Sequence, residues 1–306
     1  VMSTKLVRTA IRMMMKLAVK KEAEDEDEDE EEEQEEVENT GEEKKQDKEE
    51  KKKEENKFNK LWENFGKNLK LGVIEDSANR ANLSKLLRFY TLKNPNELIS
   101  LEQYVKNMHK KQEFIYFLAG QDREVLLKSP LLQKLKERDV DVLLLDDPID
   151  EFCVQNLVEF DKKKLKNVAK KDLKLWDEDE ELEKKKFDKI KKHYDILIKW
   201  WKNRLGKQVE SIEISKRLVD NPCIIVASEH GYSANMQRIS ESQAFTNQDK
   251  STSSYLYGKK YLEINPNHPA IKTLRQRIVE SEKPDAYVED TADLLFESAL
   301  LESGII

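Results

Sequence analysis

The 306-residue sequence has few of the residues that disulfide-bonded or turn-rich proteins use, with 2 cysteines, 8 glycines and 7 prolines. Two cysteines cannot form a disulfide framework, and Cys153 and Cys223 both stand in apolar surroundings where a free thiol packs as a small hydrophobic group. No apolar run approaches the roughly 20 residues that cross a bilayer. We therefore expect neither a disulfide scaffold nor a membrane span.

Motifs that would indicate catalysis are also missing. There is no glycine-rich phosphate loop, and no Gly-x-Ser-x-Gly turn surrounds Ser228 or Ser233, which flank His230. None of the 4 histidines is spaced with Cys, Asp or Glu as zinc ligands are. The residues by themselves predict no catalytic, cofactor-binding or metal site.

Charge is abundant but unevenly placed, because 38% of the residues are charged and the net charge is only -7. Every residue from Asp25 to Glu33 is acidic, and a mixed Lys/Glu stretch follows up to Lys57. Like charges at this density repel one another, which predicts a disordered insertion over residues 21–57. The alternative is loose calcium binding by residues 22–38, since carboxylates suit calcium. The charge balance gives no reason to expect nucleic acid as a partner.

Apolar residues recur at helical spacing on both sides of this insertion. We expect a helix over residues 5–17 whose apolar face contains Leu6 and Met13, a second helix from Phe58 to a break at Gly72, and a third over residues 83–90. These segments could form a helical bundle.

The next segment alternates between strand-like and helical patterns. Ser100 and Gln103 form a capping box that opens a short helix, and Pro148 suits the first turn of another helix. In chain order we expect a strand, a helix, a strand and a helix at residues 114–119, 126–138, 140–145 and 148–160. This alternation predicts a small parallel α/β layer.

The last part begins with a long helical pattern over residues 182–201 that Gly206 ends. Strands are expected at residues 209–214 and 223–227, the second because five apolar residues stand between Pro222 and a turn. Ser233 should cap a helix. Two more helices are expected after residue 269, the second very apolar.

Tyr255, Leu256 and Tyr257 form an apolar cluster within a serine-rich segment. Large apolar side chains in a polar surrounding indicate either a contact surface or a small satellite of the core.

Three stretches of this region, PCIIVAS, GYSANMQRI and KKYLEINPNHP, resemble the C-terminal domain of the heat-shock protein 90 chaperones. Upstream, NFGKNLKLGVIEDSANR and DDPIDEFCVQNLVEF resemble the middle domain of the same family, in the same order. The resemblance implies a helical part of the middle domain at 1–96, a small αβα subdomain at 97–177 and a mixed C-terminal dimerisation domain at 178–306 that lacks the last helix of the family's domain. The expected fold class is accordingly α/β and α+β.

The family's activity implies which cofactors and partners belong to the whole protein and which of them this chain can bind. Its members are ATP-driven dimeric chaperones, so ATP and Mg are cofactors of the whole protein, and unfolded clients, co-chaperones and a second copy of the chain are partners. The nucleotide domain is not represented in this sequence, which reads as a fragment of a longer protein. The resemblance therefore implies no cofactor and no ATP hydrolysis in the fragment alone.

Two groups of residues take roles from the resemblance. The resemblance implies that clients contact an amphipathic segment, which here contains Tyr255, Leu256 and Tyr257. It also implies contact with the aromatic residue before Ser-Ala-Asn-Met, which here is Tyr232. The family has Trp where this chain has Tyr232, so the contact area is smaller here. Dimerisation falls on the apolar terminal helix, with Ala292, Leu294, Leu295, Ala299 and Leu300.

The stretches GVIEDSANR, YFLAG and PCIIVAS are most similar to the endoplasmic-reticulum branch of the family. The implied location is the lumen of that compartment, with plastid or cytoplasm as alternatives. A different class also stays open, namely a scaffolding module whose acidic linker binds calcium loosely.

Overall fold

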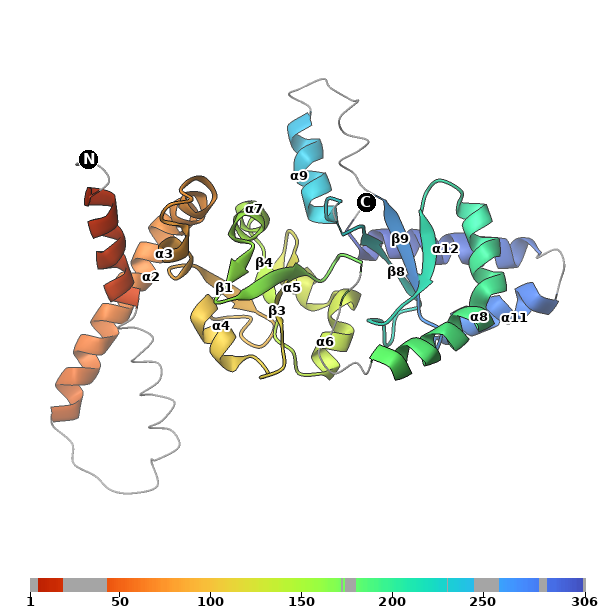
Figure 1. Cartoon of the computed structure of the whole chain (residues 1–306), viewed down its shortest axis with the longest axis horizontal. Helices are drawn as coiled ribbons and strands as arrows, with labels where there is room; N and C mark the ends of the chain where they lie inside the picture. Colours follow the sequence, from red (N-terminus) through yellow and green to blue (C-terminus); the bar gives the residue numbers. More distant parts are fainter. Residues whose placement is uncertain are drawn as a thin grey trace. The chain divides into compact units, whose positions relative to one another are not determined.

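The computed structural model describes residues 5–18, 43–171, 173, 180–229, 231–244, 259–280 and 285–304 (Figure 1). Only the backbone is described for residues 43–57, 180–184, 241, 243 and 244. The chain divides into two compact units. The first contains Val1–Phe89, Leu98–Lys106 and Phe152–Lys162; the second contains Tyr90–Glu97, Asn107–Glu151 and Lys163–Ile306. The three-domain division expected from the sequence stays a prediction.

The first unit is mainly helical. A helix over residues 5–18 is followed by α2 (Glu43–Glu75) and α3 (Arg80–Ser84). Arg80 ends α2, because its guanidinium donates to the carbonyl oxygens of Val73 at 2.7 Å and Ile74 at 3.0 Å, which have no partner inside the helix. Arg80 thereby fixes the turn between the two helices. The unit also contains the short strands β2 (Ile99–Ser100) and β5 (Glu159–Phe160) and nearly all of α4 (Leu101–Asn107).

Three expectations for this unit differ from the structure. The first helix buries Ile11 and Ala18, and leaves Leu6 exposed at 76% and Met13 at 64%, so the expected apolar face was wrong. Gly72 lies inside α2, where it makes room for the side chain of Leu83, and it does not break the helix. The third helix ends at Ser84.

After Ser84 the chain changes to β1 (Arg88–Thr91), where the apolar spacing predicted a helix. Residues 43–57, which the charge pattern predicted to belong to a disordered insertion, are helical. Glutamate and lysine pairs four residues apart support such a helix without a buried face. The acidic run itself, residues 22–38, lies outside the described residues.

The capping box before α4 is confirmed. The backbone N–H of Ser100 donates to Gln103 Oε1 at 2.8 Å, and the N–H of Gln103 donates to Ser100 Oγ at 3.0 Å. The two side chains thus satisfy two backbone donors at the helix start.

The second unit begins with a parallel sheet, as expected from the alternating pattern. Strand β3 (Phe114–Ala119) pairs in parallel with β4 (Leu143–Leu145) on one side and with β6 (Lys163–Asn167) on the other. The last residues of β1 pair antiparallel with β4. All three residues of β4 are buried, as a strand covered on both faces requires.

Helices around this sheet are shorter than predicted. The expected helix at 126–138 is α5 (Arg123–Leu127), a 3₁₀ turn at Pro130–Leu132 and α6 (Gln133–Glu137). Pro130 causes the break, because it lacks an N–H and disfavours helical geometry at Ser129. The helix α7 (Pro148–Leu157) begins at the predicted proline and ends at Leu157, before Val158, whose φ is 62°.

A second sheet follows, with strand order β7-β9-β8. Strand β7 (Ser211–Ile214) runs parallel to β9 (Lys260–Ile264), and β8 (Cys223–Ala227) runs antiparallel to β9. Strand β8 has the predicted bounds and all five of its residues are buried. Strand β9 was not predicted.

Three helices pack around this sheet: α8 (Glu180–Leu205), α11 (Pro269–Glu280) and α12 (Ala286–Glu302) (Figure 1). Helix α8 ends at Leu205 and is followed by Gly206, whose φ of 55° suits glycine. Trp201 of α8 is completely buried, as are Leu262 of β9 and Ile271 of α11. No helix in the described part of the chain is both long and apolar enough to cross a membrane.

Candidate functional site

The segment after β8 forms the start of helix α9 (Ala234–Ala244). Ser233 caps this helix, as predicted, because its Oγ accepts from the N–H of Met236 at 3.1 Å. Gly231 is buried and Tyr232 is half-buried just before the cap. The Ser-Ala-Asn-Met sequence is therefore a helix start whose position depends on its polar side chains.

A completely buried carboxylate holds this helix start. Glu151 of α7 has an exposed fraction of 0%. Its Oε1 accepts from Ser233 Oγ at 2.6 Å and from Asn167 Nδ2 at 3.2 Å, and its Oε2 accepts from Asn235 Nδ2 at 3.0 Å. Three donors from β6 and from the α9 start thus converge on one carboxyl group, which joins the first sheet of this unit to α9.

Burial raises the pKa of Glu151 above its ordinary value, while the hydrogen bonds from Ser233 and Asn235 act in the opposite direction. The nearby Lys170 also favours the ionised form. The sequence gives no signal for this role of Glu151, because a glutamate in the first turn of a helix usually complements the helix dipole.

A buried ion pair, formed by Arg217 and Glu263, lies between the two sheets of this unit. Arg217 Nη2 lies 3.0 Å from Glu263 Oε1, and the two side chains are exposed by only 4% and 9%. The same guanidinium donates to the backbone oxygens of Val168 and Lys170. Residue Lys170 also forms a parallel bridge with Ala227 of β8. The two sheets are therefore connected by backbone and charged contacts.

The residues predicted to contact clients are only partly within the described chain. Tyr255, Leu256 and Tyr257 lie outside the described residues. Tyr232 is described, and it immediately precedes the α9 cap that Glu151 holds. The role of all four residues stays a prediction.

Helix α12 has two different faces. Ala292 and Ala299, predicted at the dimer interface, are buried in the core of their own unit with exposed fractions of 0% and 1%. Leu295 and Leu300 are partly buried against the same core. Leu294 points outward and is 64% exposed. Of the five predicted dimer residues, Leu294 is thus the most available to a partner.

Two further apolar residues share the outward face of Leu294. Tyr287 is 66% exposed and Leu301 is 64% exposed, each seven residues from Leu294. Residues at this spacing lie along one side of a helix. We call Tyr287, Leu294 and Leu301 the outer stripe of α12.

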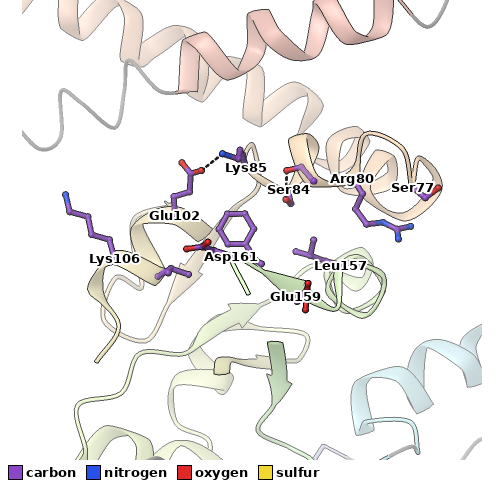
Figure 2. Close-up of a pocket in the computed structure, with 12 residues that line it drawn as sticks. Ser77, Arg80, Ser84, Lys85, Glu102, Lys106, Leu157, Glu159 and Asp161 are labelled. Carbon is purple, nitrogen blue, oxygen red and sulfur yellow. Dashed lines mark hydrogen bonds and ion pairs between the residues drawn. The ribbon is translucent and has the colours of Figure 1, made fainter. Parts of the chain in front are cut away.

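A cavity of about 800 Å³ lies in the first unit, beside α3 and α4 (Figure 2). Its lining carries Arg80, Lys85 and Lys106 and also three carboxylates, Glu102, Glu159 and Asp161. Figure 2 shows Lys85 reaching Glu102, with an Nζ–Oε1 distance of 3.0 Å. Because the charges balance, the lining does not select a ligand of one sign.

No group of three or more potential ligands (His, Cys, Asp or Glu) that could hold a metal ion occurs among the described residues. Calcium binding by residues 22–38 stays a prediction, since those residues lie outside the described part.

Comparison with known proteins agrees with these features. The model of the protein family described as "Hsp90 protein" matches residues 49–306. This chain belongs to the Hsp90 family.

Two curated plant relatives show which members it resembles. It is 43% identical over 251 residues to an endoplasmin homolog of Arabidopsis thaliana and 42% identical over 251 residues to one of Catharanthus roseus. These matches cover 82% of this chain in each case, but only 29% and 30% of the relatives. The chain thus spans less than a third of the length of these curated relatives.

Proposed function

We propose that this chain is the part of an ATP-dependent chaperone that holds partly folded clients and pairs with a second copy of itself. The family membership gives the chaperone class. The observation that carries the proposal is the outer stripe of α12, three large apolar side chains that are each more than 60% exposed. An exposed apolar stripe beside a well-packed inner face is typical of a helix that pairs with a partner.

The partner proposed for the stripe is the same helix of a second copy. The inner face of α12 is already used by Val288, Ala292 and Phe296, all buried against the chain's own core. The outer stripe is not part of this core, and its one recorded side-chain contact in the described residues is the Arg277 guanidinium, 5.2 Å from the centre of the Tyr287 ring. A paired stripe would bury side chains that each contribute roughly 1.5–3 kcal/mol when fully covered.

Sedimentation equilibrium tests the pairing. The parent chain should increase in mass with concentration from 36.0 kDa toward twice that value. The double variant Leu294→Ser/Leu301→Ser should stay monomeric, because the stripe becomes polar. Ile196→Ser is the matched control, since Ile196 is 54% exposed on α8 and should leave pairing unchanged. A parent chain that stays monomeric at all concentrations would refute the pairing.

Suppressed aggregation tests client holding. Heat-denatured citrate synthase should scatter less light in the presence of the chain, and Leu256→Ser/Tyr257→Ser should weaken this effect. If the parent chain gives no suppression, the client part of the proposal fails.

The proposed location is the lumen of the endoplasmic reticulum. The relatives reported above are endoplasmin homologs, and the sequence resembles that branch of the family. An antibody against this chain should co-localise with a lumenal marker. Staining of plastids or cytoplasm would overturn this part.

A further inference from the structure

The sequence contains a single Asn-x-Ser/Thr tripeptide, Asn82-Leu83-Ser84. This is the acceptor pattern for N-linked glycans, because the asparagine amide takes the sugar and the hydroxyl two positions later is recognised with it. Proline, which would prevent recognition, does not occupy the middle position. The tripeptide forms the last three residues of α3, within the first unit. Its accessibility can therefore be judged from the fold.

The Asn82 side chain is exposed. Its backbone N–H donates to the carbonyl oxygen of Asn79 at 2.9 Å, but no hydrogen bond of its side-chain amide is recorded within the described part of the chain. Asn79 is the opposite case, since it is 7% exposed and its Nδ2 donates to Asp76 Oδ2 at 2.6 Å. A sugar on Asn82 Nδ2 therefore breaks none of the recorded contacts.

The other two residues of the tripeptide are buried. Leu83 is 6% exposed and packs where Gly72 of α2 leaves room for its side chain. Ser84 is 2% exposed, and its Oγ donates to the carbonyl oxygen of Ala81 at 3.0 Å. A glycosyltransferase must bind the Ser84 hydroxyl together with the Asn82 amide, so both groups have to be accessible at once. The folded tripeptide is thus a closed acceptor, and any modification has to precede the packing of α3.

Arg80 determines when this acceptor closes. Its guanidinium binds the carbonyl oxygens of Val73 and Ile74 and thereby fixes the turn that brings α3 against α2. The bonded residues are only 7 and 6 positions apart in sequence. Local contacts of this kind form quickly. The time available for modification is therefore short, and we expect only a fraction of the chains to be modified.

We propose that a fraction of the chains carries an N-linked glycan on Asn82, added while the chain enters the lumen. The inference rests on the proposed location in the endoplasmic reticulum, where lipid diphosphate-linked oligosaccharides are the sugar donors. Asn82 Nδ2 forms a bond to the anomeric carbon of the first N-acetylglucosamine, and the bond from that carbon to the diphosphate oxygen breaks. The lipid diphosphate leaves, and the proton from Nδ2 passes to solvent through a base of the transferase. The glycan marks chains whose first unit closed slowly.

Expression behind a cleavable secretion signal tests the acceptor itself, because the signal brings the chain into the lumen whatever its own location. In cultured animal cells the parent chain should give two bands on a gel, and digestion with peptide N-glycosidase should merge the slower band with the faster one. The slower band should be lost in Asn82→Gln and in Ser84→Ala, and kept in Ser84→Thr. Asn68→Gln is the matched control, since Asn68 is an exposed asparagine of α2 without the acceptor pattern.

Two comparisons test whether folding closes the acceptor. The purified bacterial chain should stay unmodified in detergent-solubilised microsomes, whereas the peptide acetyl-Ala-Asn-Leu-Ser-Lys-amide should be glycosylated there. In cells, Arg80→Ala should increase the share of the slower band, because the turn after α2 closes later. Equal modification of the folded chain and the peptide would refute the protection of the acceptor by α3.

The chain isolated from its own cells decides the proposal. After digestion with Lys-C and an endoglycosidase, the peptide of residues 71–85 should carry an N-acetylglucosamine on Asn82 in part of the molecules. An unmodified peptide from these cells would overturn the proposal. If the chain behind the secretion signal is also unmodified, the acceptor has failed and the proposed location stands. If only the native chain is unmodified and antibody staining lies outside the lumen, the proposed location has failed instead.

Discussion

Arg217 and Glu263 form an ion pair that is almost completely removed from solvent. Arg217 Nη2 lies 3.0 Å from Glu263 Oε1, and Nε donates to Oε2 at 3.0 Å. Ser215 Oγ donates to the same Oε2 at 2.8 Å. The pair lies where β9 meets the residues after β6, so the contact joins the two sheets of the second unit.

Arg217→Met should destabilise the chain by about 3–5 kcal/mol, because Glu263 would keep a buried charge without its partner. Urea unfolding followed by circular dichroism measures this loss. The double variant Arg217→Met/Glu263→Leu should recover a large part of it, since no buried charge remains. A double variant that is as unstable as the single one would show that the guanidinium bonds to Val168 and Lys170 matter more than the ion pair.

Arg204 forms a similar arginine–carboxylate ion pair at the surface. It binds Asp293 through two bonds, Nε to Oδ1 at 2.8 Å and Nη2 to Oδ2 at 2.6 Å, but the side chains are 28% and 43% exposed. Arg204 Nη1 also lies 2.9 Å from Glu289 Oε2. Solvent screens both pairs, so Arg204→Met should cost only about 1 kcal/mol. A loss as large as that of Arg217→Met would contradict the role given to burial.

The same pair predicts a pH dependence. The hydrogen bond from Arg204 holds the pKa of Asp293 below its ordinary value of 3.8. A lowered pKa means that the stabilisation is fully present above pH 3.8 and is lost as the pH falls through the lowered value. Urea unfolding at pH 6, 4 and 3 should therefore show a smaller decline for Asp293→Asn than for the parent. Equal declines would refute this assignment.

Cys223 should be unreactive in the folded chain. Burial, with a smaller contribution from Glu302, raises the pKa of its thiol to about 12. The reactive species is the thiolate, which is then almost absent at pH 8. Ellman's reagent should label neither Cys223 nor the equally buried Cys153 until urea unfolds the chain, and then both. Rapid labelling of Cys223 in the folded state would contradict the packing of β8.

Trp201 tests the core of the second unit. It is completely buried, and among the described atoms its Nε1 has no hydrogen-bond partner. Trp201→Ala should cost about 3–5 kcal/mol because it leaves a large cavity. Trp201→Phe should cost roughly 1 kcal/mol, since it keeps most of the apolar contact and removes the unpaired donor. Thermal unfolding of both variants gives the comparison.

The sequence predicted elements best where the pattern was local. Strand β8 was found with its bounds because five apolar residues stand between a proline and a turn. Strand β6 was missed, because three of its five residues are lysines and it looks like a solvated segment. Strand β1 was read as helix because Leu83, Leu87 and Tyr90 are spaced as on a helix. Pairing with β2 and β4 decides its conformation, and that pairing depends on residues far away in sequence.

The candidate site was less predictable for the same reason. Ser233 could be found as a cap from its neighbours, but Glu151 reaches it across 82 positions of sequence. Asn235 likewise looks like an ordinary helix residue. The convergence of Ser233 and Asn235 on Glu151 depends on how α7 and α9 lie in the fold, which no local pattern contains.

Strand β9 lies in the centre of its sheet and comes last of the three strands in the chain. On a ribosome, β7 and β8 therefore leave the exit tunnel without the strand that joins them. Neither can complete its ladder until residue 264 has been synthesised, some 50 residues after β7. We expect the folding of this sheet to be the slowest folding step during synthesis of the chain. Nascent chains that stop before Lys260 should be cleaved by proteases throughout β7 and β8.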